Sequence, residues 1–198
     1  MNIEFINAQQ TDLQKIVATY NSTVASRLVT ADLEPVAVES KQAWFDAHSE
    51  NRRPLWIIEV EGVYAGWMSF NSFYGRPAYD GTVEVSIYLE ESSRGKGLGK
   101  ICLQKAFDAC QELHIKTLLG FIFDHNEPSL QLFYKMGFEK WAHLPKIANM
   151  IDAELSPENL TCDGELPAAQ VRQRHSYLVQ VAKELQKFDP SVKFYEFA

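Results

Sequence analysis

The most regular alternation of hydrophobic and polar residues in this chain runs from Thr82 to Leu89. A period of two is typical of a β-strand, whose successive side chains point to opposite faces of a sheet. The pattern therefore predicts a central strand with one aliphatic face and one face that includes a carboxylate. The two faces are Val83, Val85, Ile87 and Leu89 on one side, and Glu84, Ser86 and Tyr88 on the other.

Helical spacing follows this strand in two places. Apolar residues recur every three or four positions from Leu98 to Leu113, and again from Pro128 until Gly137 ends the pattern. Near the N-terminus, Thr11 to Gln14 resembles a capping box with Thr11 as N-cap, which predicts a helix from that point. A further helix is expected at about 38–48.

The other apolar runs are short and bounded by turn residues, which is typical of strands. They lie at 3–8, 55–60, 63–70, 117–123, from 138 onward, and at 175–181. Strands and helices are thus interspersed, and we predict an α/β (α+β) fold in a single domain over residues 1–182. Within it, residues 147–169 lack a sustained period and are expected to form an irregular excursion. Residues 183–198 are expected to form a C-terminal tail.

Composition narrows the classes of protein that fit. The 198 residues are 46% hydrophobic and 23% charged, which is ordinary for a globular protein. No apolar run is long enough to span a bilayer, so a cytoplasmic location without a membrane partner is expected. The net charge of -7 argues against nucleic acid as a partner. The three cysteines form no C-x-x-C pair and the histidines lack metal-ligand spacing, so reduced thiols and no metal site are expected.

A glycine-rich segment, R-G-K-G-L-G at 94–99, connects the central strand to the next helix. Glycines before a helix leave backbone N–H groups free to point at an anion, so the segment predicts a phosphate cradle; the alternative is a flexible hinge. A P-loop is excluded because Arg94 and Ile101 stand where it requires Gly and Ser or Thr. A dinucleotide fingerprint is excluded because Cys102 stands where it requires Gly. The spacing that fits is R-x-x-G-x-G.

Several separated motifs occur together with this segment. The chain resembles the phosphinothricin acetyltransferase branch of the GNAT acetyltransferase superfamily, which includes acetyltransferases for methionine sulfoximine and methionine sulfone. The resemblance covers roughly residues 3–144. Its motifs are Y-N-S-T-V (20–24), A-W-F-D (43–46), P-L-W (54–56), G-W (66–67), F-Y-G-R-P-A-Y (73–79), T-V-E-V-S-I-Y-L (82–89), R-G-K-G-L-G (94–99) and N-E-P-S-L-Q-L-F-Y-K-M-G-F (126–138).

The resemblance implies a mixed, mostly antiparallel sheet that splays between strands 82–89 and 117–123 and is flanked by helices. Acetyl-CoA is expected in the splay, its pantetheine arm paired with the backbone of the first strand and its pyrophosphate held by amides of the glycine-rich segment. A homodimer is also implied. The cofactor-binding residues expected on this basis are Ser86, Ile87, Tyr88, Leu89, Arg94, Gly95, Lys96, Gly97, Leu98, Gly99, Lys100, Asn126, Ser129 and Phe133.

The chain departs from the family pattern at Phe133, where many members have Tyr, or His in this branch, as an acid for the departing thiolate. Tyr134 is one residue off and points to another side of the helix. A dedicated acid is therefore not expected, and a thiol pKa of about 8.5 lets the thiolate leave and take its proton from water. The usual branch ending after 138 is replaced by the 147–169 excursion.

The reaction expected is direct acetyl transfer from acetyl-CoA to the primary amine of a small amino-acid-like acceptor. Glu84 is the candidate base, acting through water, and a backbone N–H near Val85 or Ser86 is the candidate oxyanion donor. Arg76 is suited to grip a substrate carboxylate. The rings around Arg76 either form a pocket rim or cover the sheet edge. The substrate-binding residues expected are Phe73, Tyr74, Arg76, Tyr79 and Glu84.

Two other functions fit the same residues. One is acetylation of a different amine, such as a peptide N-terminus or a polyamine, which lacks the free carboxylate that Arg76 would grip. The other is a non-catalytic acetyl-CoA-binding module, which the absence of an acid at Phe133 permits.

Overall fold

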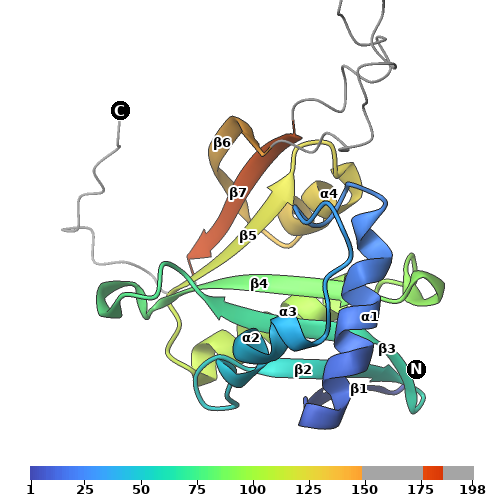
Figure 1. The fold of residues 1–198 in the computed structure, drawn as a ribbon. Coiled ribbons are helices and arrows are strands. Elements are labelled where there is room, and N and C mark those ends of the chain that lie inside the picture. The colour runs from blue at the N-terminus through green and yellow to red at the C-terminus, as the bar shows by residue number, and fades with distance from the viewer. Residues whose placement is uncertain (149–175, 185–198) are drawn as a thin grey trace, which may run out of the picture.

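The computed structural model describes residues 1–148 and 176–184 (Figure 1). The strands are β1 (Ile3–Asn7), β2 (Leu55–Val60), β3 (Val63–Ser72), β4 (Thr82–Leu89), β5 (Thr117–Phe123), β6 (Glu139–Ala148) and β7 (Ser176–Glu184). The α-helices are α1 (Leu13–Val24), α2 (Gln42–Asp46), α3 (Leu98–Glu112) and α4 (Glu127–Lys135). Short 3-10 turns stand at Gln10–Asp12, Glu39–Lys41, Pro77–Tyr79 and Glu91–Ser93.

The strands form one sheet in the order β1-β2-β3-β4-β5-β7-β6. Every neighbouring pair is antiparallel except β4 and β5, which are parallel. The β4–β5 register covers only Thr82, Val83 and Glu84 on β4, whereas β3 pairs with β4 as far as Leu89. The two central strands therefore diverge after Glu84, as Figure 1 shows. The predicted fold class and the splayed, mostly antiparallel sheet are confirmed.

The two faces of the sheet pack against different helices. Odd-numbered β4 residues such as Val83 and Val85 join the main core, which includes the buried side chains of α3 and α4. The other face packs a smaller aromatic cluster, with Trp67 and Tyr88 beneath α1 and α2. Figure 1 shows α1 and α2 together in front of the strands. The alternation at 82–89 thus separates a closed core from a face that bears polar groups.

Two helix starts differ from the prediction. The capping box expected at Thr11 is formed instead by Gln9, whose backbone N–H donates to the Asp12 carboxylate at 2.7 Å, and α1 begins at Leu13 after a 3-10 turn. The helix expected at 38–48 is a 3-10 turn followed by five residues of α2. In both places the backbone enters the helix through a tighter 3-10 turn, which apolar spacing does not reveal.

The C-terminal predictions are described only in part. The strand expected at 175–181 is β7, which extends to Glu184. β6 extends to Ala148, so the first two residues of the expected 147–169 excursion are strand. The rest of that excursion, and the tail beyond residue 184, lie outside the described residues. None of the helices in the described part is long and apolar enough to cross a membrane.

Candidate active site

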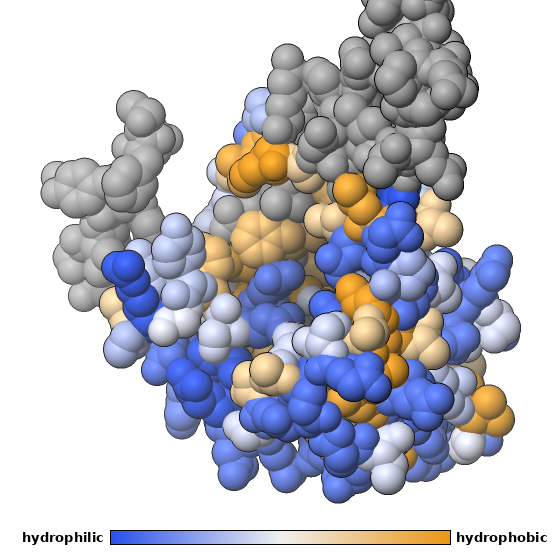
Figure 2. All heavy atoms as spheres, in the orientation of Figure 1, coloured by the Kyte–Doolittle hydropathy of each residue, from blue (hydrophilic) through white to orange (hydrophobic). Residues whose placement is uncertain are grey.

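A pocket of about 90 Å³ lies on the face of the sheet beneath α1 and α2. Its lining comes from four parts of the chain: α1, α2 together with the 3-10 turn before it, β3 and β4. In the space-filling view of this face, apolar surface is exposed between hydrophilic residues (Figure 2). The lining residues are Ile16, Val17, Tyr20, Lys41, Trp44, Trp67, Asn71, Ser86 and Tyr88.

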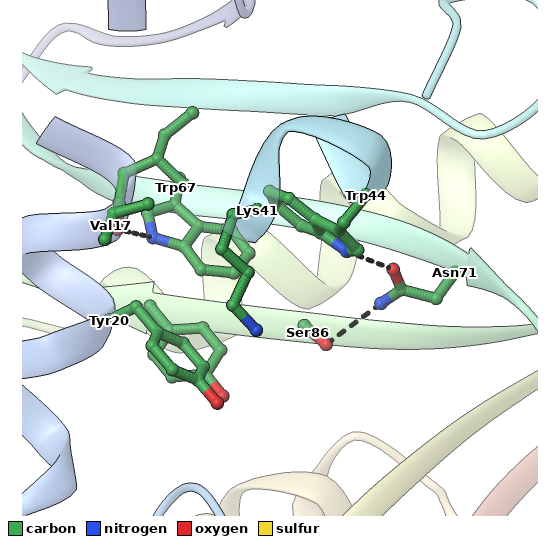
Figure 3. A pocket seen from close by; sticks show the side chains of 9 residues that line it. Val17, Tyr20, Lys41, Trp44, Trp67, Asn71 and Ser86 are labelled. Carbon is green, nitrogen blue, oxygen red and sulfur yellow. Dashed lines mark hydrogen bonds between the residues drawn. The ribbon is translucent and has the colours of Figure 1, made fainter. Parts of the chain in front are cut away.

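Hydrogen bonds and ring contacts hold the pocket walls in place. The Trp44 indole N–H donates to Asn71 Oδ1 at 3.0 Å, and Asn71 Nδ2 donates to Ser86 Oγ at 3.2 Å (Figure 3). The Trp67 ring stacks on the Tyr88 ring with centroids 4.5 Å apart. Its indole N–H donates to the backbone carbonyl of Ile16 at 3.0 Å, which ties the sheet to α1. The polar end at Asn71 and Ser86 is therefore preorganised.

Lys41 brings a cation to this pocket. Figure 3 shows its ammonium group reaching between Tyr20 and Ser86. The Nζ atom lies 4.6 Å from the centroid of the Tyr20 ring and 3.9 Å from the Asp32 carboxylate. The Tyr20 hydroxyl bonds to Asp32 and Thr30. Burial and the Asp32 bond raise the pKa of Tyr20 to about 12, so the phenol stays neutral at physiological pH.

Glu84 lies on the same face of β4 as Ser86 and Tyr88. It pairs with Asn71 on β3 and with Leu119 on β5, and it is the last β4 residue in register with β5. Burial raises the pKa of its carboxyl above the ordinary value. A carboxyl with a raised pKa at the point where two strands part is a candidate proton acceptor.

The glycine-rich segment forms an open turn before α3. Gly95 and Gly97 have φ values of +72° and +81°, and a Cβ on either would meet no atom within 4 Å. These left-handed conformations favour glycine, and the space beside the turn is open. Within the described part of the chain, the backbone N–H groups of residues 95–97 donate to no other backbone group. An anion such as a pyrophosphate fits this turn.

Other residues of the segment have structural contacts. Arg94 Nε donates to the carbonyl of Leu89 at 3.0 Å, which closes the turn against the end of β4. A Cβ on Gly99 would lie 2.6 Å from Leu132, so this glycine permits α3 to pack on α4. The Lys96 and Lys100 side chains are exposed, whereas Leu98 is buried in the main core.

The turn after β5 contains Asn126 and Ser129. Asn126 Oδ1 accepts the Ser129 N–H at 3.3 Å, so Asn126 is the N-cap of α4. Its Nδ2 donates to the carbonyl of Leu28 at 3.0 Å, which joins this turn to the loop after α1. Phe133 is 7% exposed, with its ring against Gly120 and 4.7 Å from the Phe138 centroid. Phe133 is therefore a core side chain, and its contact with a cofactor stays a prediction.

The loop between β3 and β4 contains the other predicted residues. Phe73 contacts the rings of Tyr74 and Tyr79, and stacks on Phe121 of β5 at 6.5 Å. Tyr74 is 74% exposed, and Arg76 is also exposed. The rings thus form one cluster that reaches β5, and Arg76 lies in the same loop with its side chain in solvent.

The family follows from comparison with known proteins. The model of the acetyltransferase (GNAT) family matches residues 17–138, which is more than half of the chain. The chain belongs to the acetyltransferase (GNAT) family. The resemblance predicted from the motifs is confirmed, as is the expectation of an acetyltransferase. Residues 17–138 include both Glu84 and the 94–99 segment.

Individual GNAT relatives extend the comparison. The chain is 54% identical over 144 residues to the Bacillus subtilis (strain 168) protein YwnH, a proposed phosphinothricin acetyltransferase; the match covers 72% of this chain and 88% of YwnH. It is 29% identical over 148 residues to the L-methionine sulfoximine/L-methionine sulfone acetyltransferase of Pseudomonas paraeruginosa, covering 74% and 86%. A Sinorhizobium meliloti phosphinothricin acetyltransferase, solved in complex with acetyl-CoA, shares the fold, with a TM-score of 0.77 at 22% identity and coverage of 97% and 96%.

Several pocket residues of this GNAT protein were given no role from the sequence. Tyr20 and Trp44 stand in the motifs Y-N-S-T-V and A-W-F-D, so their place in the family pattern was a usable signal. Lys41 and Asn71 stand outside those motifs, and only the folded chain brings them to Ser86.

Cys102 and Cys110 are free and buried in α3, and burial raises the pKa of each thiol to about 12. Among the described residues, no cluster of His, Cys, Asp or Glu could hold a metal ion.

Proposed function

We propose that this GNAT protein transfers acetyl directly from acetyl-CoA to the primary amine of a small amino-acid-like acceptor, of the phosphinothricin, methionine sulfone or methionine sulfoximine type. The observation on which this rests is the position of Glu84. Its carboxyl lies where β4 and β5 part, on the face that holds the pocket, and burial raises its pKa. A proton acceptor is thus close to both the splay and the pocket.

The region beyond Glu84, where β4 and β5 diverge, suits acetyl-CoA. Beyond Glu84, the β4 edge that faces β5 has no strand partner in the described structure, although β3 still covers the other edge. Along residues 86–89, the backbone groups that point to this edge can pair with the amides of a pantetheine arm, apart from the Leu89 carbonyl, which accepts from Arg94. The open turn at 95–97 suits the pyrophosphate, and Lys96 and Lys100 add positive charge. Acetyl-CoA supplies the thioester, and these residues hold and orient it.

The acceptor is proposed to lie across the pocket face. Arg76 binds the carboxylate of the acceptor, because a guanidinium can donate hydrogen bonds to both carboxylate oxygens. Its amine lies near Glu84. Its side chain enters the pocket toward Lys41 and Ser86, which are suited to an oxygen-rich end such as a sulfone or phosphinate. The aromatic walls at Trp44 and Tyr88 enclose the apolar part of the side chain.

The amine must lose a proton before it attacks the thioester carbon. Glu84 takes that proton, through water, while a β4 backbone N–H near Val85 or Ser86 stabilises the developing oxyanion. The C–S bond then breaks and the thiolate departs. Phe133 is apolar and buried, so the thiolate takes its proton from water.

The test is a thiol-release assay with acetyl-CoA and a panel of amines. The proposal expects turnover of phosphinothricin, methionine sulfone and methionine sulfoximine, and weaker turnover of the same amino acids as C-terminal amides. Turnover confined to polyamines or peptide N-termini would assign a different acceptor. Acetyl-CoA binding by calorimetry, with no turnover of any amine, would identify a non-catalytic binding module instead.

We also propose a cytoplasmic homodimer with one catalytic domain, which runs to the end of β7 at Glu184, two residues beyond the bound predicted at 182, and with 185–198 as a tail. The family resemblance and the composition support this part of the proposal. Sedimentation velocity measures the oligomeric state directly. A monomer at micromolar concentration with full activity would contradict the dimer.

A further inference from the structure

Arg53 is the one charged residue among the buried side chains of the described structure, at 5% exposure. It lies just before Pro54 and β2, and sequence reasoning assigned it no role. Its backbone N–H donates to the carbonyl of Ser49, and the Ser49 N–H donates to the carbonyl of Arg53, each at 2.9 Å. The guanidinium therefore extends from a fixed base.

The guanidinium joins both ends of the loop that contains Arg76. Its Nε donates to Ser72 Oγ at 2.8 Å, where β3 ends, and its Nη2 donates to the carbonyl of Asp80 at 3.0 Å, just before β4. The third donor, Nη1, bonds to the carbonyl of Arg52 at 2.9 Å. Only a planar group with several fixed donors can make these bonds at once.

Backbone hydrogen bonds connect Asp80, which Arg53 contacts, to the loop that contains Arg76. From Asp80 the chain runs back through the 3-10 turn at Pro77–Tyr79, with the Asp80 N–H donating to Pro77 and the Tyr79 N–H donating to the carbonyl of Arg76. These bonds measure 3.1 and 2.9 Å. A shift of Asp80 is thus transmitted to the backbone of Arg76.

We infer that Arg53 is a positioning residue, which fixes both ends of the 73–79 loop so that Arg76 meets the acceptor's carboxylate. This inference rests on the proposed function, in which Arg76 grips that carboxylate. Lysine at position 53 keeps a positive charge but cannot reach Ser72, Asp80 and Arg52 together, so the loop loses its fixed geometry. The effect is specific to acceptors that carry a carboxylate.

The experiment compares kcat/KM for one amino acid and for its C-terminal amide, each corrected for the unprotonated fraction of its amine. The wild type is expected to prefer the free acid about 10-fold or more, as expected for a hydrogen bond to a charged group. Arg53→Lys should bring this ratio close to 1 through a raised KM for the free acid, with the dissociation constant of acetyl-CoA unchanged. In an Arg76→Lys background, Arg53→Lys should add nothing, because both changes remove the same interaction.

Arg52→Lys is the matched control. Arg52 is the neighbouring residue and contacts the same Asp80, with Nη2 2.8 Å from Oδ1, but its side chain is 60% exposed and has no bond to Ser72. It should keep the wild-type ratio. Ser72→Ala, at an exposed position, removes only the Nε partner and should lower the ratio partway even if Arg53→Lys does not fold.

The outcomes separate the two claims. A wild type that does not prefer the free acid overturns the role proposed for Arg76, and the positioning role with it. The wild type can prefer the free acid while both Arg53→Lys and Ser72→Ala keep the same ratio of kcat/KM values. That result leaves the role of Arg76 in place and overturns the role of Arg53.

Discussion

The glycine turn at 95–97, which is the proposed anion site, and the pocket beneath α1 and α2 are built in opposite ways. The turn is one contiguous stretch that offers backbone N–H groups, with Gly95 and Gly97 in left-handed conformations. The pocket uses side chains from four parts of the chain, from Ile16 in α1 to Tyr88 in β4. Glu84 lies on β4 two residues before the pocket residue Ser86, where β4 and β5 part, and the turn follows the other end of that strand. A backbone site depends on local conformation, whereas a side-chain site depends on how distant elements pack.

The largest expected effect comes from Glu84, the proposed base on the pocket face of β4. Glu84→Gln keeps the shape and removes the base, so kcat should fall by about 10²–10⁴-fold while acetyl-CoA affinity stays nearly constant. Activity should partly recover as pH rises, because solution then deprotonates the amine. Steady-state kinetics across pH measure this. A Gln variant with wild-type kcat and an unchanged pH profile would show that Glu84 only lines the sheet.

The backbone site is tested by Gly97→Val. A side chain at φ +81° strains the turn and fills the space beside it, so the dissociation constant of acetyl-CoA should rise at least ~10-fold, or roughly 1.4 kcal/mol. Gly62→Val is the matched control, because Gly62 has a φ of +74° and equally open surroundings, in the turn between β2 and β3. Calorimetry should show normal binding for that control. If the two folded variants bind acetyl-CoA with the same dissociation constant, the turn at 95–97 is not an anion site.

The side-chain site is tested by Lys41→Met, which keeps an unbranched stem over Tyr20 and removes the charge. Turnover of methionine sulfone and phosphinothricin should fall about 10-fold relative to methionine, the size of one lost hydrogen bond to a charged group. Lys15→Met is the control, since Lys15 also lies over a tyrosine ring, 5.0 Å from the Tyr64 centroid, and beside Asp12 at 2.9 Å, but outside the pocket. An unchanged ratio in the Lys41 variant would remove Lys41 from acceptor selection.

The smallest effect is on stability. Burial raises the pKa of Glu84 in the folded state, so between the ordinary and the raised value the folded chain binds more protons than the unfolded chain. Wild-type stability therefore falls as pH rises through that window, and Glu84→Gln has no such loss. The melting temperature of the variant, relative to wild type, should rise with pH and then level off. A difference that does not change with pH would mean that the carboxyl is not desolvated in the folded state.

Some residues of this protein follow the local sequence pattern and others do not. The alternation at 82–89 predicted both faces of β4, because a period of two has one structural meaning in a sheet. Gly97 and Gly99 look alike in R-x-x-G-x-G, yet Leu132 packs against Gly99 while the space beside Gly97 is open. Thr11 fitted the capping pattern, but Asp12 accepts the Gln9 N–H. These failures occur where neighbours distant in sequence, or a change of helix type, decide the outcome.

The sequence by itself determined the family, through motifs spread over residues 3–144. It also determined the order of strands and helices and the glycine turn at 95–97, since these depend on spacing within a short stretch. Only the tertiary structure decided that Lys41 lies over the Tyr20 ring in one pocket with Ser86, and that Arg53 bonds to Ser72 and Asp80. The residues of these pairs are 19 to 45 positions apart in the sequence, and they come together only after β2, β3 and β4 have paired and α1 has packed on them. Periodicity records which face a residue takes, whereas the register of pairing decides which side chains on that face meet.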